Sequence, residues 1–420
     1  MAANSACWRW HAIKCSVFAG LVVLSIRSAI AASLSFQTAL VLAEQNAPSL
    51  AAESDAIESA QSSLVSAGRL PDPKLFLGIE SFPVSGPPAG TFDDNSAMGR
   101  VGIMQEVPNT TKRHAQIDIA EANVRRVEAD REVERLRVRR EVAVAWLTRY
   151  YLERKDTLLA ELERENKLLA DAITAQLAAN EASAPDTVIP KQEAAMLAGR
   201  RDELARDIAQ AKAALRHWVG DAADNVLAGD PPNFTIDHRS LRHHLDDHPE
   251  LAAYSTKSAV AQAEVREATA AKIPDWGVEL SYGRRDPAFG DVVSLQVSID
   301  LPLFTSKRQN PRIAAKQAEV NQIDAERQAL LLDHAQELES DVAEHDRLDR
   351  AVDRQQSTFI PLAQEKVSLA MAAYGAGNST LTDVLAARRE LIDSRLKLID
   401  LQSQQAQLTA RLHYTFEEGK

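Results

Sequence analysis

The sequence has very little cysteine, and what it has lies close to the start. Cys7 and Cys15 are the only cysteines among 420 residues. A short basic segment precedes the apolar run Val17–Ile26, and the small-residue pattern Ala29–Ala31 follows it. This order is typical of a secretory signal peptide, here predicted over residues 1–31. The mature chain would then contain no thiol, so we expect neither a disulfide nor a lipid anchor on cysteine.

Long hydrophobic runs, glycine and aromatic residues are also scarce. No stretch of about 18 apolar residues follows the predicted signal peptide, so no membrane-spanning helix is expected there. The chain has 16 glycines and 5% aromatic residues, and its abundance of alanine, leucine, glutamate and arginine favours long helices. Its formal charge of −12 argues against a nucleic-acid partner. An exported chain of this kind is either soluble or crosses a membrane as a β-barrel.

Local catalytic motifs are missing as well. The sequence contains no glycine-rich phosphate loop, no CxxC, no HExxH and no Gly-x-Ser-x-Gly turn. These patterns would indicate phosphate binding, redox or zinc chemistry, or a nucleophilic serine. We therefore expect neither an enzyme nor a bound cofactor.

One pattern occurs twice in the chain. Pro71-Asp72-Pro73 is matched by Pro274-Asp275-Trp276, and Lys112-Arg113 by Lys307-Arg308. The distance of about 200 residues is far longer than any solenoid repeat, so it indicates a duplicated unit. Each copy is predicted to contain a helix, two strands, a very long helix and a further helix. The predicted boundaries are a first repeat over 32–220, a linker over 221–237 and a second repeat over 238–420.

Four short segments with alternating apolar residues predict strands, near residues 74–82, 99–107, 276–284 and 292–301. Each has about ten residues, the length that a tilted strand needs to cross a bilayer. One face of each strand is apolar and the other is small or polar, most clearly in the second copy. Two hairpins of a soluble sheet would give the same periodicity and remain an alternative. Four strands cannot close a barrel, so a membrane barrel would need several chains.

Aromatic and basic residues mark the ends of these strands. Trp276 and Tyr282 lie six residues apart on the apolar side, close to the spacing of the two aromatic girdles of a membrane barrel. Four cations directly follow the strand pairs and are expected to mark the periplasmic membrane–water boundary: Lys112, Arg113, Lys307 and Arg308.

Very long helices are predicted after each strand pair. The segment from Thr111 to about Asn180 contains neither glycine nor proline, which predicts a helix of roughly 100 Å. Its counterpart runs from about Pro311 to Tyr374, with a kink predicted at Pro361. Apolar residues recur at heptad-like steps, so these helices are expected to pack side by side as coiled coils in a tube or bundle.

The turn before the last helix carries a familiar sequence. The stretch Tyr374–Leu385 resembles the second helix turn of TolC-type outer-membrane efflux proteins, as do the segments around Pro108 and Leu301–Phe304. The resemblance covers Leu34 to Phe416. It implies a mainly α fold and a homotrimer in which three sets of four strands close one twelve-stranded β-barrel in the outer membrane. The helices would continue as an α-barrel through the periplasm.

The same resemblance implies a function in transport. A channel of this family would meet a periplasmic adaptor protein and an inner-membrane proton-driven pump. The segments Met104–Asn109 and Leu301–Phe304 resemble the heavy-metal cation efflux subfamily, of the cobalt-zinc-cadmium and copper-silver type. Export of drugs or secreted polypeptide by the same channel is one alternative. A soluble periplasmic coiled-coil adaptor is an alternative of another class, and it would have no membrane strands.

Acidic residues at two helix turns are candidates for a periplasmic gate. The family pattern implies two acids in the last turn, but here only Asp383 is present and Ala386 occupies the second position. Asp186 occupies the matching turn of the first copy. A ring of three such carboxylates would favour protonation or a bound cation and would select cations over anions. Capping of the following helix is the alternative role.

The segment from His243 to His248 is the one motif that suggests metal binding, with His238 nearby. On a helix, His244 and His248 would share a face, and imidazole suits zinc, copper and nickel. The segment opens the second copy, so it is expected on the outside of the helical tube, near its equator. The start of a surface helix is therefore the alternative interpretation.

Overall fold

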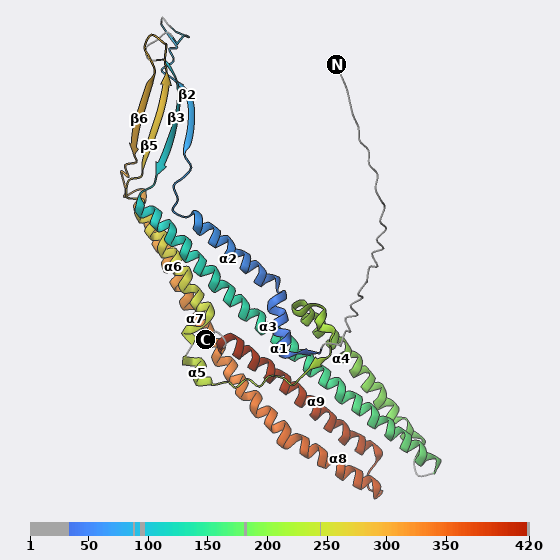
Figure 1. Ribbon diagram of the computed structural model, residues 1–420. Helices are drawn as coiled ribbons and strands as arrows, with labels where there is room; N and C mark the ends of the chain where they lie inside the picture. The colour runs from blue at the N-terminus through green and yellow to red at the C-terminus, as the bar shows by residue number, and fades with distance from the viewer. Residues whose placement is uncertain (1–32, 87–88, 93–96, 180–182, 244, 418–420) are drawn as a thin grey trace, which may run out of the picture.

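The structure is a computed structural model that describes residues 33–86, 89–92, 97–179, 183–243 and 245–417. The predicted signal peptide, with Cys7 and Cys15, lies outside these residues. The fold is mainly helical, as predicted, with a small four-stranded sheet at one end of a long helical part (Figure 1). Among the described residues, no helix combines the length and the hydropathy that crossing a membrane requires.

The duplicated unit is visible in the order of the elements. The first copy contains α1 (Phe36–Asn46), α2 (Pro48–Ser66), β2 (Lys74–Glu80), β3 (Met98–Val107), α3 (Thr110–Ala178) and α4 (Ile189–Val219). The second contains α5 (His238–His243), α6 (Pro249–Ala270), β5 (Trp276–Arg284), β6 (Val292–Ile299), α7 (Gln309–Arg354), α8 (Ile360–Gly375) and α9 (Leu381–Leu412). Both copies thus place two strands between helices, while the repeat boundaries drawn from the sequence stay predictions.

Helix α3 runs along most of the helical part (Figure 1). It has 69 residues, which corresponds to about 100 Å at 1.5 Å per residue. Asn109 begins it, because the Asn109 side chain accepts a hydrogen bond of 2.8 Å from the backbone N–H of Lys112. The predicted bounds of this helix are confirmed to within two residues.

The counterpart of α3 is interrupted where a kink was predicted. A π-helical turn, Gln355–Phe359, separates α7 from α8 and ends two residues before Pro361. Proline has no N–H for the preceding turn and its ring crowds the carbonyl four residues before it, so the helix widens there. The Gln355 side chain donates a hydrogen bond of 2.9 Å to the Ser394 carbonyl and so ties the turn to α9.

The main apolar core lies at mid-length of the molecule. Trp146 of α3 is fully buried and meets Phe36 edge-on, with ring centroids 5.4 Å apart. The indole of Trp146 donates to the Leu34 carbonyl at 3.2 Å. The buried Arg149 guanidinium donates to the carbonyls of Ala223 and Asn225, at 2.6 and 2.8 Å. These contacts hold both the start of the described chain and the linker between the copies against α3.

The sheet has the order β2-β3-β5-β6, and all three pairings are antiparallel. Its strands match the predicted segments to within two residues at each end. A second, very short parallel pair joins β1 (Leu34–Ser35) to β4 (Leu227–Ala228) near the core. Strands β2 and β6 are the outer strands of the large sheet, and each has one hydrogen-bonded neighbour among the described residues.

Candidate functional site

One face of the large sheet is apolar and open to the surroundings. The register aligns one residue from each strand in a continuous row: Leu75, Ile103, Leu280 and Leu295. These side chains are 68%, 55%, 55% and 70% exposed. A second row lies beside it and contains Leu77, Val101, Tyr282 and Val293. An apolar surface this continuous indicates a missing apolar neighbour, either a lipid or a protein.

The opposite face of the sheet is more polar, and Arg100 at its centre is paired within the chain. Arg100 of β3 pairs with Glu80 at 2.9 Å, donates to the Ser281 hydroxyl at 2.9 Å and also pairs with Glu279. Its guanidinium lies 5.3 Å from the ring centre of Phe76. Gly102 leaves room for these groups, since a Cβ there would come within 2.4 Å of Phe76. The predicted alternation therefore separates apolar and polar residues most clearly in β5 and β6, whereas in β2 and β3 the apolar Phe76, Met98 and Met104 also lie on the Arg100 face.

The two predicted girdle residues lie at opposite ends of β5 on the apolar face. Trp276 and Tyr282 are 46% and 42% exposed. The Tyr282 hydroxyl also hydrogen-bonds the Asp291 carboxylate in the turn between β5 and β6. Six residues of strand place the two rings about 20 Å apart, so their spacing fits the predicted girdles. The girdle role itself stays a prediction.

The four predicted boundary cations differ in environment. Lys112 pairs with Asp275 at 2.8 Å, and Arg113 donates to the Gly68 carbonyl at 2.7 Å. These two side chains are partly buried and hold the strands to the helices. Lys307 and Arg308 are exposed beside the start of α7. All four lie where the sheet meets the helical part, so the geometry is compatible with the predicted boundary.

The two candidate gate residues form equivalent helix caps. Asp383 accepts hydrogen bonds from the backbone and hydroxyl of Thr380, at 3.0 and 2.7 Å. Asp186 accepts in the same way from Ser183, at 2.9 and 2.6 Å. These bonds to Thr380 and Ser183 lower the pKa of each carboxyl, so both are ionised near neutral pH.

Both turns lie at the end of the molecule opposite the sheet (Figure 1). A small apolar cluster joins them, in which Ile173 of α3 packs with Leu381 and Leu385 of α9. The capping role considered for Asp383 is therefore present in the chain. A ring of three Asp383 side chains needs further copies, so the gate stays a prediction.

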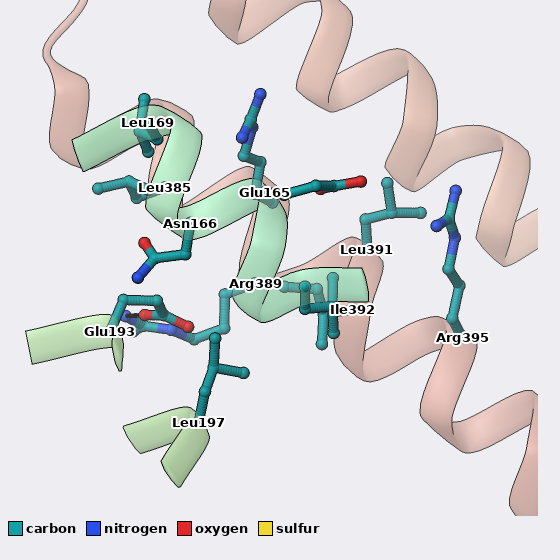
Figure 2. Close-up of a pocket in the computed structure, with 12 residues that line it drawn as sticks. Glu165, Asn166, Leu169, Glu193, Leu197, Leu385, Arg389, Leu391, Ile392 and Arg395 are labelled. Atoms are coloured by element: carbon teal, nitrogen blue, oxygen red, sulfur yellow. Dashed lines mark hydrogen bonds and ion pairs between the residues drawn. The ribbon is translucent and has the colours of Figure 1, made fainter. Parts of the chain in front are cut away.

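A small cavity near this end lies between α3, α4 and α9 (Figure 2). Its volume is about 50 Å³, which is space for a few water molecules rather than for cargo. Arg389 of α9 pairs with the buried Glu193 of α4 at 2.7 Å, and Asn166 donates to the Pro190 carbonyl at 2.9 Å. These contacts identify the cavity as part of the packing between the helical hairpins.

The predicted histidine motif is divided between the end of one helix and the start of the next. Helix α5 ends at His243, and His248 is the N-cap of α6, where it accepts a hydrogen bond from the Glu250 backbone at 3.2 Å. The prediction that His244 and His248 share one helix face stays a prediction, because His244 lies outside the described residues. The alternative interpretation, the start of a surface helix, is confirmed in part: His248 begins α6, but it is only 6% exposed and so does not lie at the surface.

His248 packs against His334 of α7, a residue that the sequence motif did not include. The two ring centres are 4.1 Å apart, and His334 Nε2 lies 3.2 Å from a Glu250 carboxylate oxygen. The hydrogen bond to Glu250 raises the pKa of His334. Burial, together with the neighbouring His334, lowers the pKa of His248 to about 4. His334 lies in a regular helix far away in sequence, so no local pattern could have revealed this pair.

A second histidine cluster joins α5 to α7. His238 lies beside His345 and Asp346, and one ligand atom from each residue lies within 4.8 Å of the others. The atoms of His248, Glu250 and His334 meet the same limit. In that group, however, His248 Nδ1 already accepts a hydrogen bond from the Glu250 backbone N–H at the start of α6. The sequence pointed to the segment around His238, but it did not indicate His345 and Asp346.

Comparison with known proteins gives a family match and a fold match. A family model described as "Outer membrane efflux protein" matches residues 241–414. VceC, an outer membrane protein of Vibrio cholerae, has a TM-score of 0.72 at 20% identity, covering 90% of this chain and 95% of that chain. A membrane protein of Pseudomonas aeruginosa has a TM-score of 0.77 at 17% identity, with 91% and 90% covered.

A third solved structure, the open state of the MtrE outer membrane channel of Neisseria gonorrhoeae, has a TM-score of 0.71 at 17% identity, with 91% and 89% covered. No curated protein sequence matches the chain. At these identities the structural likeness concerns the fold. Residues 241–414 thus match the outer membrane efflux protein family, and the described chain as a whole has the fold of bacterial outer-membrane channels.

Proposed function

We propose that this protein is the outer-membrane exit channel of a tripartite efflux system and that it works as a homotrimer. The observation that carries the proposal is the sheet with one continuous apolar face, at one end of a helical part in which α3 alone is about 100 Å long. A single sheet of four strands leaves β2 and β6 with unpaired edges, which a folded protein normally covers or pairs. Pairing β6 of one copy with β2 of the next supplies the missing neighbour.

Three copies joined in this way would close a twelve-stranded barrel. Their apolar rows would face lipid, and the Arg100 face would line the water-filled interior. The helices would extend from the barrel into the periplasm and end at the turns that carry Asp186 and Asp383. An adaptor protein and a proton-driven pump of the inner membrane are the partners that such a channel requires. The alternative of a soluble adaptor offers no use for the exposed apolar rows.

Heavy-metal cations are the cargo that we favour. The support is the resemblance of Met104–Asn109 and Leu301–Phe304 to channels of metal efflux systems, together with acidic residues at the periplasmic end. Drugs or a secreted polypeptide are the alternative cargo for the same architecture. Because the pump normally selects what is exported, the genes expressed together with this channel decide between these alternatives.

The decisive experiment combines fractionation with conductance. The full chain, expressed in a Gram-negative host, should reach the outer membrane as a heat-resistant trimer and form cation-selective pores in planar bilayers. Recovery as a soluble periplasmic monomer would reject the channel. Deletion in the native host should then lower resistance to zinc, cobalt, cadmium, copper or silver. Lowered resistance to drugs alone would reject the metal cargo and leave the channel intact.

A further inference from the structure

The second histidine cluster has the composition of a metal site. His238 Nδ1 lies 3.8 Å from a carboxylate oxygen of Asp346, and the rings of His238 and His345 are perpendicular with centres 5.4 Å apart. Two imidazoles and one carboxylate are common ligands of zinc and of neighbouring divalent metals. Tetrahedral zinc with bonds of about 2.0–2.1 Å holds its ligand atoms roughly 3.3 Å apart. Small side-chain rotations would close the observed distances to that value.

Helix α5 is fixed in the position that brings His238 to α7. Leu241 is 1% exposed and packs in an apolar cluster with Leu338 and Val342 of α7. The next residue, Arg242, forms a two-pronged pair with Glu339, at 2.6 and 3.0 Å. These contacts hold the backbone of the short helix against α7, so the ligand side chains start close together before any ion binds.

A second carboxylate orients one of the imidazoles. His345 Nδ1 lies 3.6 Å from Asp349, is buried and has no hydrogen-bond partner among the described residues. A histidine that binds a metal through one ring nitrogen usually directs its other N–H towards a carboxylate. Asp349 is positioned to take that part, which leaves the second nitrogen of His345 available to an ion. The Asp349 carboxylate is itself held by the Gln405 side chain.

The cluster also has a route for ions from the surrounding solvent. His345 and Asp349 line an open cleft of about 580 Å³ between α3, the linker between the copies, α7 and α9. Tyr150, Asp230 and Gln405 contribute further polar atoms to its walls. An ion can therefore reach His345 without unfolding of the helical part.

We propose that His238, His345 and Asp346 bind one divalent cation of the zinc class, with water in the fourth position. The bound ion would link α5, the first helix of the second copy, to α7. This site involves the side of the helical part where the linker crosses, and it is independent of which cargo the channel carries. The group around His248 is a poorer ligand set, because metal binding through its second nitrogen would require loss of the bond that begins α6.

The test is zinc titration by calorimetry on the full-length protein in detergent, carrying a tag without histidine. We expect one site per chain. His238→Gln and His345→Gln should each weaken binding at least about 100-fold, and Asp349→Asn by roughly 10–100-fold, as for other residues that orient a ligand. His114→Gln, at an exposed histidine of α3 outside both clusters, is the matched control and should bind like the unaltered protein.

Two results would overturn the proposal. One is unaltered zinc affinity in the His238→Gln and His345→Gln variants, with circular dichroism showing intact helices. The other is loss of binding in His248→Gln or His334→Gln while the His238 and His345 variants still bind. If the first two variants fail to fold, Asp346→Asn on the exposed side of the cluster repeats the test, and unaltered affinity there has the same meaning.

Discussion

His248 and His334 are in contact, yet their pKa values are shifted in opposite directions. His334 faces the carboxylates of Glu250 and Glu337, so its protonated form is stabilised and its pKa is raised. His248 is buried between His334, Arg140 of α3 and the C-terminal segment around Thr415, and its pKa is lowered to about 4. Near neutral pH the pair therefore holds one positive charge at most, placed on His334. This contact joins α6 to α7.

The lowered pKa of His248 gives a prediction for stability at acidic pH. Its folded pKa lies below the unfolded value, so its contribution is complete above about pH 6.5 and is lost as the pH falls towards 4. A shift of this size corresponds to roughly 2–4 kcal/mol per chain. His248→Asn keeps an oxygen that can cap α6 but does not titrate, so it should flatten the decline of the melting temperature between pH 7 and pH 4.

Circular dichroism melts at several pH values measure this effect. His217→Asn, at an exposed histidine of α4, is the control and should follow the unaltered protein. If the melting temperatures of the His248→Asn and unaltered proteins fall in parallel between pH 7 and pH 4, burial of His248 does not control the loss of stability at acidic pH.

At the scale of elements, the strands were easier to predict than the histidine contacts. Alternation has a period of two, and a one-residue slip would move Leu75 or Leu295 to the other face, so the local sequence determines the register strongly. The proline at position 361 likewise predicted the break in the helix, because proline cannot continue a regular helix. By contrast, the contacts of His238 and His248 depend on how α5 and α6 pack on α7, which no local pattern encodes.

The two faces of β6 provide a direct test of the membrane strands. Leu295 lies on the apolar face, and the adjacent Ser294 lies on the face of Arg100. If the apolar face meets lipid, an arginine there costs about 2–4 kcal/mol near mid-membrane. Leu295→Arg should therefore abolish assembly of heat-resistant trimers in the outer membrane, whereas Ser294→Arg should assemble. Equal tolerance of both changes would argue for a soluble sheet.

At the scale of the whole molecule, the duplication suggests how one copy of the chain meets the next. Lys112 follows β3 and pairs with Asp275, which precedes β5. In the repeat, Lys307 follows β6 and is the counterpart of Lys112. Asp72 precedes β2 and is the counterpart of Asp275. If β6 of one copy pairs with β2 of the next, Lys307 should meet Asp72 across that boundary.

Charge exchange tests this contact between copies. Lys307→Asp and Asp72→Lys should each place like charges together and lower the temperature at which the trimer dissociates in detergent. The double variant should restore most of that temperature, because the pair is re-formed with its signs reversed. Single variants that resist heat as well as the unaltered trimer, or a double variant no better than the singles, would refute the assigned neighbour.

At the end of the molecule opposite the sheet, Asp383 caps a helix and is also the candidate gate residue. In the single chain, Asp383 is ionised and caps α9 through Thr380. In a closed trimer, three such carboxylates would surround the pore and attract divalent cations. Asp383→Asn should therefore weaken divalent blockade from the periplasmic side in planar bilayers and reduce cation selectivity, while the amide oxygen can still accept the bonds of the cap. Asp186→Asn provides the matched comparison at the first turn. Trimers with unchanged blockade and selectivity in both variants would leave these residues as helix caps alone.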